Sequence, residues 1–187
     1  IPLTDEPTYR LLQRGGTVGI FQLESDGRQK LCREFGVSRI QDIIALLALY
    51  RPGPLQFKDV FVKRRRGVEK VVYEVPELMA PILDETCGIM LYQEQIMQIV
   101  QVLAGFSLGN ADLLRRAIGK KKEKEMLAQH DKFVEGCLKH RGIPKETAES
   151  IWENIKKFAD YGFNKSHSAA YAFLSYRTAY LKANHPV

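Results

Sequence analysis

The sequence predicts a mainly α-helical protein with one or two short β-strands. Apolar residues recur at helical spacing over long stretches, as at Ile96, Ile99, Val100 and Leu103. Glycine and proline separate these stretches, most clearly at Arg51-Pro52-Gly53-Pro54. Alternation of apolar and polar residues, which indicates strands, is confined to two short segments. Helices therefore dominate the expected fold.

The N-terminal elements follow from these signals in order. Residues 1–16 predict a short helix that ends at Gly15-Gly16, and Thr17–Leu23 predict a strand because of their β-forming residues. Ser38 is a plausible N-cap for a helix over residues 39–50. The apolar face of that helix would contain Ile40, Ile43, Ile44 and Leu47. Proline removes a backbone donor, so the Arg51–Pro54 segment ends the helix.

Residues 55–76 are expected to form an irregular basic segment containing Lys63-Arg64-Arg65-Arg66. Val71–Tyr73 form the second candidate strand. A brief helix is predicted over residues 76–85, and an amphipathic helix over residues 92–106.

The C-terminal part predicts four more helices. They cover residues 109–118 and 123–140, a segment starting near Pro144, and a final segment through Lys182. Met126, His130, Phe133 and Cys137 share a face of the second helix, and Ala148, Ile151, Trp152 and Ile155 share one on the third. Gly142 is suited to the C-terminal cap position. Ser166 or Ser168 would cap the last helix. We treat residues 1–187 as a single helical region.

Composition narrows the class of protein. A net charge of +6 suits a polyanionic partner without identifying one. Cys32, Cys87 and Cys137 lie far apart, which argues against a disulfide framework and against a zinc site. No apolar run approaches the length of a bilayer span, so no membrane association is expected. Both ends of the sequence look cut from a longer chain.

Catalytic groups are not evident. Asp84 and Glu85 are neighbours in a predicted helix and would point about 100° apart, so they do not converge on a metal. Asp112 precedes Arg115 and Arg116 by three and four residues, a spacing typical of ion pairs on a helix. The sequence therefore predicts neither a catalytic residue nor a metal site.

Three polar or basic clusters remain as candidate binding sites. The first is Arg115-Arg116 with Lys120-Lys121, where apolar neighbours would fix one helix face and arginine forks suit phosphate oxygens. The second is Asn164-Lys165-Ser166-His167, at the start of a helix that favours anions. The third is Lys63–Arg66, which could follow a DNA backbone. For each cluster, an ordinary solvated face or helix cap is the alternative.

Five segments together resemble one family. They are Gly19-Ile20-Phe21-Gln22-Leu23-Glu24-Ser25, the run from Leu46 to Leu55, the run from Tyr92 to Gln98, the run from Ala111 to Lys121, and the run from Tyr161 to Tyr171. In this order they resemble the fingers region of the C-family replicative DNA polymerases of bacteria, the α subunits of DNA polymerase III. The resemblance covers nearly the whole chain.

The resemblance implies a helical fingers-type domain that binds an incoming deoxynucleoside triphosphate and closes over the nascent base pair. It implies that Arg115 and Arg116, with Lys120 and Lys121, contact the triphosphate. Asn164, Lys165, Ser166 and His167 match a segment near the nucleotide sugar, and Tyr92 would lie near the pocket or serve in packing. Primer–template DNA would be the other substrate.

The family also implies what lies outside this chain. Its Mg²⁺-binding aspartates belong to a palm domain, so the chain alone is expected to be inactive. The sliding clamp and other replicase subunits would bind elsewhere on a cytoplasmic parent enzyme. Two alternatives remain open: a non-catalytic helical module that binds nucleic acid or protein through a basic face, and a degenerate polymerase relative retained for regulation.

Overall fold

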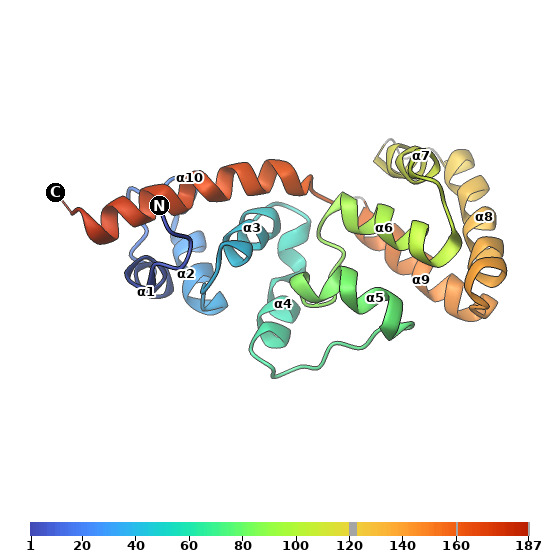
Figure 1. Ribbon diagram of the computed structural model, residues 1–187, viewed down its shortest axis with the longest axis horizontal. Helices are drawn as coiled ribbons and strands as arrows, with labels where there is room; N and C mark the ends of the chain where they lie inside the picture. The colour runs from blue at the N-terminus through green and yellow to red at the C-terminus, as the bar shows by residue number, and fades with distance from the viewer. Residues whose placement is uncertain (120–122, 160, 187) are drawn as a thin grey trace. The chain divides into compact units, whose positions relative to one another are not determined.

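The computed structural model describes residues 1–119, 123–159 and 161–186. This part of the chain is built from ten α-helices, α1 to α10, and two short 3-10 helices, η1 and η2 (Figure 1). Within the described residues, the strand-like pairing is a single isolated bridge between Tyr92 and Phe163. The predicted mainly α fold class is confirmed. No helix in the described part of the chain has the length and hydropathy that crossing a membrane requires.

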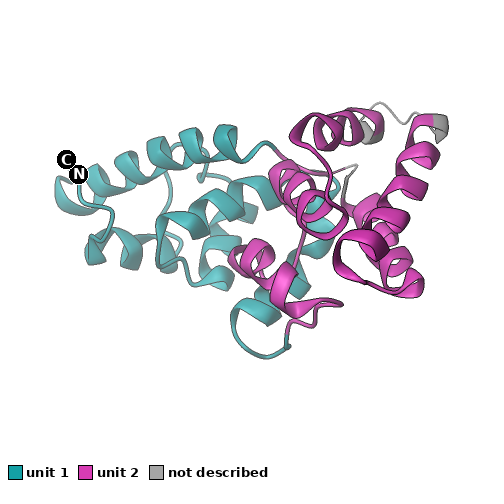
Figure 2. Ribbon diagram, turned by 45° about the vertical axis from the view of Figure 1, so that its right-hand side comes forward, with its two compact units in different colours: residues 1–70, 164–187 teal, residues 71–163 magenta. Residues whose placement is uncertain are grey.

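The chain divides into two compact units, coloured separately in Figure 2. Unit 1 contains residues 1–70 and 164–187, so the last helix returns to the N-terminal segment. Unit 2 contains the continuous stretch of residues 71–163. Each unit has its own buried core, and each is described by itself below.

Unit 1 is organised around α3. Its helices are α1 (Glu6–Gln13), α2 (Asp26–Phe35), α3 (Ile40–Leu49), η1 (Pro54–Phe57), α4 (Lys58–Arg65) and α10 (Lys165–Asn184). Nearly every side chain of α3 is buried, which explains its continuous apolar sequence. The long helix α10 packs against α3 and α1. Its buried face contains small residues, among them Ser168, Ala172 and Ala179, which allow the helix backbones to approach closely.

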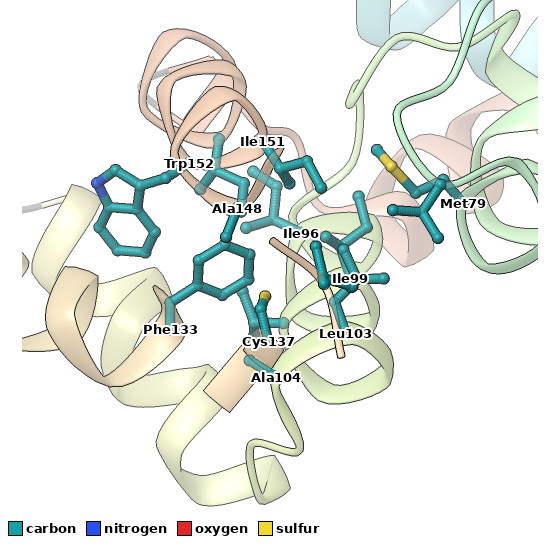
Figure 3. Close-up of a cluster of buried hydrophobic side chains, with 14 of the residues drawn as sticks. Met79, Ile96, Ile99, Leu103, Ala104, Phe133, Cys137, Ala148, Ile151 and Trp152 are labelled. Carbon is teal, nitrogen blue, oxygen red and sulfur yellow. The ribbon is translucent and has the colours of Figure 1, made fainter. Parts of the chain in front are cut away.

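Unit 2 is a bundle whose helices bury one apolar face each. They are α5 (Pro76–Leu83), η2 (Asp84–Thr86), α6 (Gln93–Ala104), α7 (Leu108–Gly119), α8 (Glu123–Arg141) and α9 (Lys145–Ala159). Figure 3 shows Phe133 of α8 between side chains of α6 and α9, with its ring centroid 5.5 Å from that of Trp152. The apolar faces predicted for α6 and α9 are confirmed, because all eight of their residues are buried.

A glycine allows α8 and α6 to approach each other. A Cβ atom on Gly136 would lie 2.4 Å from the backbone oxygen of Ala104, closer than real side chains come. Helix α8 ends at the predicted position, since Gly142 has a φ of +66°. The amides of Gly142 and Ile143 donate to the carbonyls of Leu138 and Cys137, which satisfies the last turn of the helix.

Both predicted strands are wrong. Thr17–Leu23 form consecutive turns, in which the amides of Ile20 and Leu23 donate to carbonyls three residues earlier. The Thr17 hydroxyl closes this segment by donating to the Leu23 carbonyl at 2.6 Å. Left-handed backbone at Gly19 and Gln22 is incompatible with an extended strand. Val71–Tyr73 adopt no regular structure.

The region 55–76 is more regular than predicted, because Lys58–Arg65 form α4. Helix α2 was not predicted at all. Its buried apolar residues are few, namely Leu31, Cys32 and Phe35, and they give a weak periodic signal.

Two predicted caps also differ. Ser38 does not cap α3. The Asp42 carboxylate accepts instead from the amides of Ser38 and Arg39 at 2.9 and 3.2 Å. Asn164, rather than Ser166 or Ser168, caps α10.

Candidate functional site

The two predicted arginines, Arg115 and Arg116, lie on helix α7, and the opposite face of this helix is buried. Ala111, Leu114 and Ala117 recur at every third position and are buried, which holds one face of the helix in the core of unit 2. The Arg115 and Arg116 side chains lie on the remaining surface, 33% and 62% exposed. Both guanidinium groups are therefore accessible to a ligand, while the backbone that carries them is anchored.

The Asp112 carboxylate lies between the two arginines. Its Oδ1 atom accepts from Arg115 Nε and Nη2 at 2.9 and 2.7 Å, and its Oδ2 atom lies 2.8 Å from Arg116 Nε. The predicted ion pairs are thus confirmed. Hydrogen bonds from Arg115 lower the pKa of Asp112 below its ordinary value, and the charges of both arginines act in the same direction. Asp112 is therefore a carboxylate at neutral pH.

The arginine pair is linked to the start of α6. Arg115 Nη1 donates to the side-chain oxygen of Gln93 at 3.5 Å. The Gln93 amide in turn donates to the Phe163 carbonyl at 3.0 Å. A Cβ on Gly162 would lie 3.2 Å from Gln93 Cγ, so this glycine permits the close approach. Sequence reasoning missed Gln93, although its position beside Tyr92 at the first turn of a predicted helix could have indicated it.

Tyr92 is a packing residue in this structure. Its side chain is 2% exposed, and its backbone pairs with Phe163. The buried Gln95 side chain fixes this segment: its oxygen accepts from the Tyr92 amide at 2.9 Å, and its amide group donates to the Thr86 hydroxyl at 2.8 Å. Such buried polar groups are stable only when they are hydrogen-bonded. A role for Tyr92 beside the nucleotide remains a prediction.

The second predicted cluster begins α10 in unit 1. The Asn164 side chain accepts from the His167 amide at 2.8 Å and caps the helix. The Ser168 hydroxyl donates to the Ile44 carbonyl of α3 at 2.6 Å, which anchors the first turn. Ser166 and His167 are exposed, and the His167 ring stacks on Tyr171 with centroids 4.5 Å apart. Lys165 is partly exposed at the same helix start.

The third cluster is largely engaged inside unit 1. Arg65 Nη2 donates to the Asp42 carboxylate at 2.8 Å, and the Asp42 side chain is only 4% exposed. Arg64 pairs with Glu69 at 2.8 Å, and Arg66 Nε donates to the Glu34 carbonyl at 2.9 Å. Arg65 and Arg66 thus link the C-terminal end of α4 to α3 and α2, respectively. Lys63 is exposed. The predicted DNA-backbone contact of Lys63–Arg66 stays a prediction.

The predicted site residues fall in different units. Arg115, Arg116 and Tyr92 belong to unit 2, whereas Asn164–His167 and Lys63–Arg66 belong to unit 1. Lys120 and Lys121 lie outside the described residues. In the part that the structure describes, no three His, Cys, Asp or Glu side chains are grouped so as to hold a metal ion. Asp84 accepts a hydrogen bond from the Tyr73 hydroxyl, and Asp112 is engaged by the arginines.

Comparisons with known proteins point to one family. The family model described as the bacterial DNA polymerase III alpha subunit finger domain matches residues 1–141. The chain is 51% identical to DNA polymerase III subunit alpha of Aquifex aeolicus over 188 residues, and 52% identical to that of Thermus aquaticus over 191 residues. It is 54% identical to that of Caulobacter vibrioides over 187 residues. Each match covers 100% of this chain and 16% of the relative's length.

Proposed function

Because this chain belongs to the family of bacterial DNA polymerase III alpha subunit finger domains, we propose that it binds the incoming deoxynucleoside triphosphate of a DNA-directed DNA polymerase and closes over the nascent base pair. The observation that carries the proposal is the pair Arg115 and Arg116, exposed on a helix whose opposite face is buried. The parent enzyme would transfer a deoxynucleotide to a primer end during DNA replication in the bacterial cytoplasm.

The chemistry of the arginine pair fits phosphate. Guanidinium groups donate through planar forks that match phosphate oxygens, and they remain charged at any physiological pH. Phosphoryl transfer is accelerated mainly by positioning and by charges that stabilise the transition state. Two arginines on an anchored helix supply both effects. Lys120 and Lys121 would add positive charge beyond the end of α7.

The start of α10 would contact the sugar. Ser166 and His167 are exposed on a helical turn that Asn164 caps and Ser168 anchors. We assign these two side chains to discrimination between deoxyribose and ribose, with Asn164 and Lys165 as neighbours. Tyr92 would act indirectly, by fixing the segment that contains Gln93.

The remaining parts of the reaction lie outside this chain in the proposal. Mg²⁺ would neutralise the phosphates when bound, held by aspartates of a palm domain, and no described residues form a group that fits it. The chain alone would therefore not extend a primer. Primer–template DNA would contact Lys63 and its neighbours, while the sliding clamp and other replicase subunits would bind other regions.

The test is single-nucleotide incorporation by the intact polymerase subunit carrying Arg116→Ala. Losing one charge-assisted contact should weaken transition-state binding by roughly 1.5–3 kcal/mol, which is about 10- to 100-fold in kcat/KM. Arg10→Ala is the matched control, because Arg10 also forms an exposed helical pair, with Glu6. A normal kcat/KM for Arg116→Ala would show that the triphosphate does not contact Arg116 on α7.

A further inference from the structure

The way in which Asp112 contacts the two arginines leaves particular donors available. Asp112 engages Arg116 through Nε, and it engages Arg115 through Nε and Nη2. Within the described residues, both terminal nitrogens of Arg116 and the Nη1 side of Arg115 face no carboxylate. The Gln93 oxygen, at 3.5 Å, is only a weak acceptor for Nη1. The carboxylate therefore lies beside Nε of Arg116 and along the Nε–Nη2 edge of Arg115, which leaves Nη1 of Arg115 and both terminal nitrogens of Arg116 for a ligand.

We propose that Asp112 is a positioning residue that aligns Arg115 and Arg116 as a two-arginine clamp for the phosphates of the nucleotide. This inference rests on the proposed function of α7. Asp112 itself touches no substrate in this scheme. It acts by determining where the two guanidinium groups are before the nucleotide arrives.

Electrostatics gives Asp112 this role. Arg115 and Arg116 are adjacent in sequence, and their like charges would repel each other if the two guanidinium groups came together without Asp112. One carboxylate oxygen for each arginine allows both guanidinium groups to remain on the same side of α7. Ala111, directly before Asp112, and Leu114, two residues after it, are buried, so the backbone at Asp112 is anchored with the core.

The expected change in KM on removing the charge of Asp112 follows from how well Asp112 pre-organises the two arginines. Ordering a long side chain on binding weakens affinity by a factor of roughly two to ten. Without Asp112, both arginines would have to be ordered when the nucleotide binds. Removing a negative charge from the vicinity of the phosphates acts in the opposite direction, but solvent screens that effect at an exposed site. We expect a net rise in KM of roughly five- to twentyfold when Asp112 loses its charge.

If Asp112 instead competed with phosphate for the arginines, the loss of its charge would lower KM rather than raise it. A competing carboxylate would engage the terminal nitrogens that phosphate needs, and its removal would lower KM. Asp112 contacts one terminal nitrogen, Nη2 of Arg115, and leaves the other three terminal nitrogens of the pair without a carboxylate among the described residues, which favours the positioning role. The direction of the change in KM therefore separates the two roles.

The experiment compares Asp112→Asn, Asp112→Glu and Arg116→Ala in the intact polymerase subunit, with Glu6→Gln as a control for loss of an exposed helical pair. Asparagine preserves the volume of the side chain, so the fold is retained. KM and kcat for one deoxynucleotide are measured at saturating primer–template. We expect Asp112→Asn to raise KM with kcat changed less than about threefold, and Asp112→Glu to restore most of the affinity.

A double variant shows whether Asp112 acts through its arginines. In the Arg116→Ala background, Asp112→Asn should raise KM by clearly less than it does alone, because part of the clamp is already missing. An additive effect, or an unchanged or lowered KM for Asp112→Asn beside an impaired Arg116→Ala, refutes the positioning role and leaves the proposed function intact. Normal kcat and KM values for Arg116→Ala would refute both the positioning role of Asp112 and the proposed function.

Discussion

Replacing Arg65 with alanine should loosen the packing of α4 on α3 before it affects DNA binding. Arg65 donates to Asp42 at 2.8 Å, and the Asp42 carboxylate is 4% exposed while it also caps α3. A hydrogen bond to a charged group contributes roughly 1.5–3 kcal/mol, and the loss of Arg65 leaves a buried charge with fewer partners. Water can reach the side chain of Arg65, which is 25% exposed, so we expect about 2 kcal/mol.

Hydrogen–deuterium exchange in the intact polymerase subunit measures this effect locally. A loss of about 2 kcal/mol corresponds to roughly 30-fold faster exchange for amides of α4 and the first turn of α3. Arg10→Ala should change exchange little, because its partner Glu6 is exposed. Lys63→Ala should leave exchange unchanged and reduce the salt dependence of DNA binding by about one phosphate contact. Unchanged exchange in Arg65→Ala, with weaker DNA binding, would refute the structural role assigned to Arg65.

Two further predictions concern histidines. His167→Ala in the intact polymerase should alter the ratio of kcat/KM for deoxy- and ribonucleotides, and an unchanged ratio would remove His167 from the sugar site. In unit 2, burial lowers the pKa of His130, but hydrogen bonds with Glu149 and Asp131 outweigh it and raise the pKa above 6.5. The charged pairs therefore stabilise α8 against α9 fully below about pH 6.5, and this contribution is lost as pH rises through the raised pKa. After correction for the intrinsic base-catalysed rate, the protection of α8 and α9 amides should fall over that pH range in the wild type but not in His130→Gln, and parallel protection curves for the two proteins would exclude the effect.

The sequence predicts helices well where buried apolar residues recur at helical spacing. In α6 and α9, four apolar residues fall on one face, and core packing requires that pattern. Thr17–Leu23 misled the prediction because local apolar content does not distinguish a strand from turns. The hydrogen bond between Thr17 and Leu23 and the left-handed residues decide the outcome. Neither feature can be recognised from an alternation of apolar and polar residues in the sequence.

The caps show a related limit of sequence reasoning. Ser38 is a good cap by residue type, but the Asp42 carboxylate accepts from the amides of Ser38 and Arg39 and is also the buried partner of Arg65. That partner is 23 residues away in sequence. In α7, by contrast, Asp112 and its arginines are within one helical turn, so the pairing could be predicted from spacing alone. Local geometry is readable from sequence, while the choice among several good caps depends on tertiary contacts.

Two aspartate–arginine groups among the described residues differ in burial, and burial separates their roles. Asp42 is 4% exposed and Arg65 25%, so a ligand that drew Arg65 away would leave a buried carboxylate short of donors. Asp112 is 31% exposed and Arg116 62%, and Asp112 contacts Arg116 through Nε, so the terminal nitrogens of Arg116 can bind a ligand while this pair stays formed. Binding through Arg116 therefore requires no loss of its intramolecular partner, whereas drawing Arg65 to a ligand would cost much of the packing of α4. A basic residue is available to a polyanion when it offers accessible donors without leaving a buried partner charge unpaired, and of these two arginines Arg116 meets that condition.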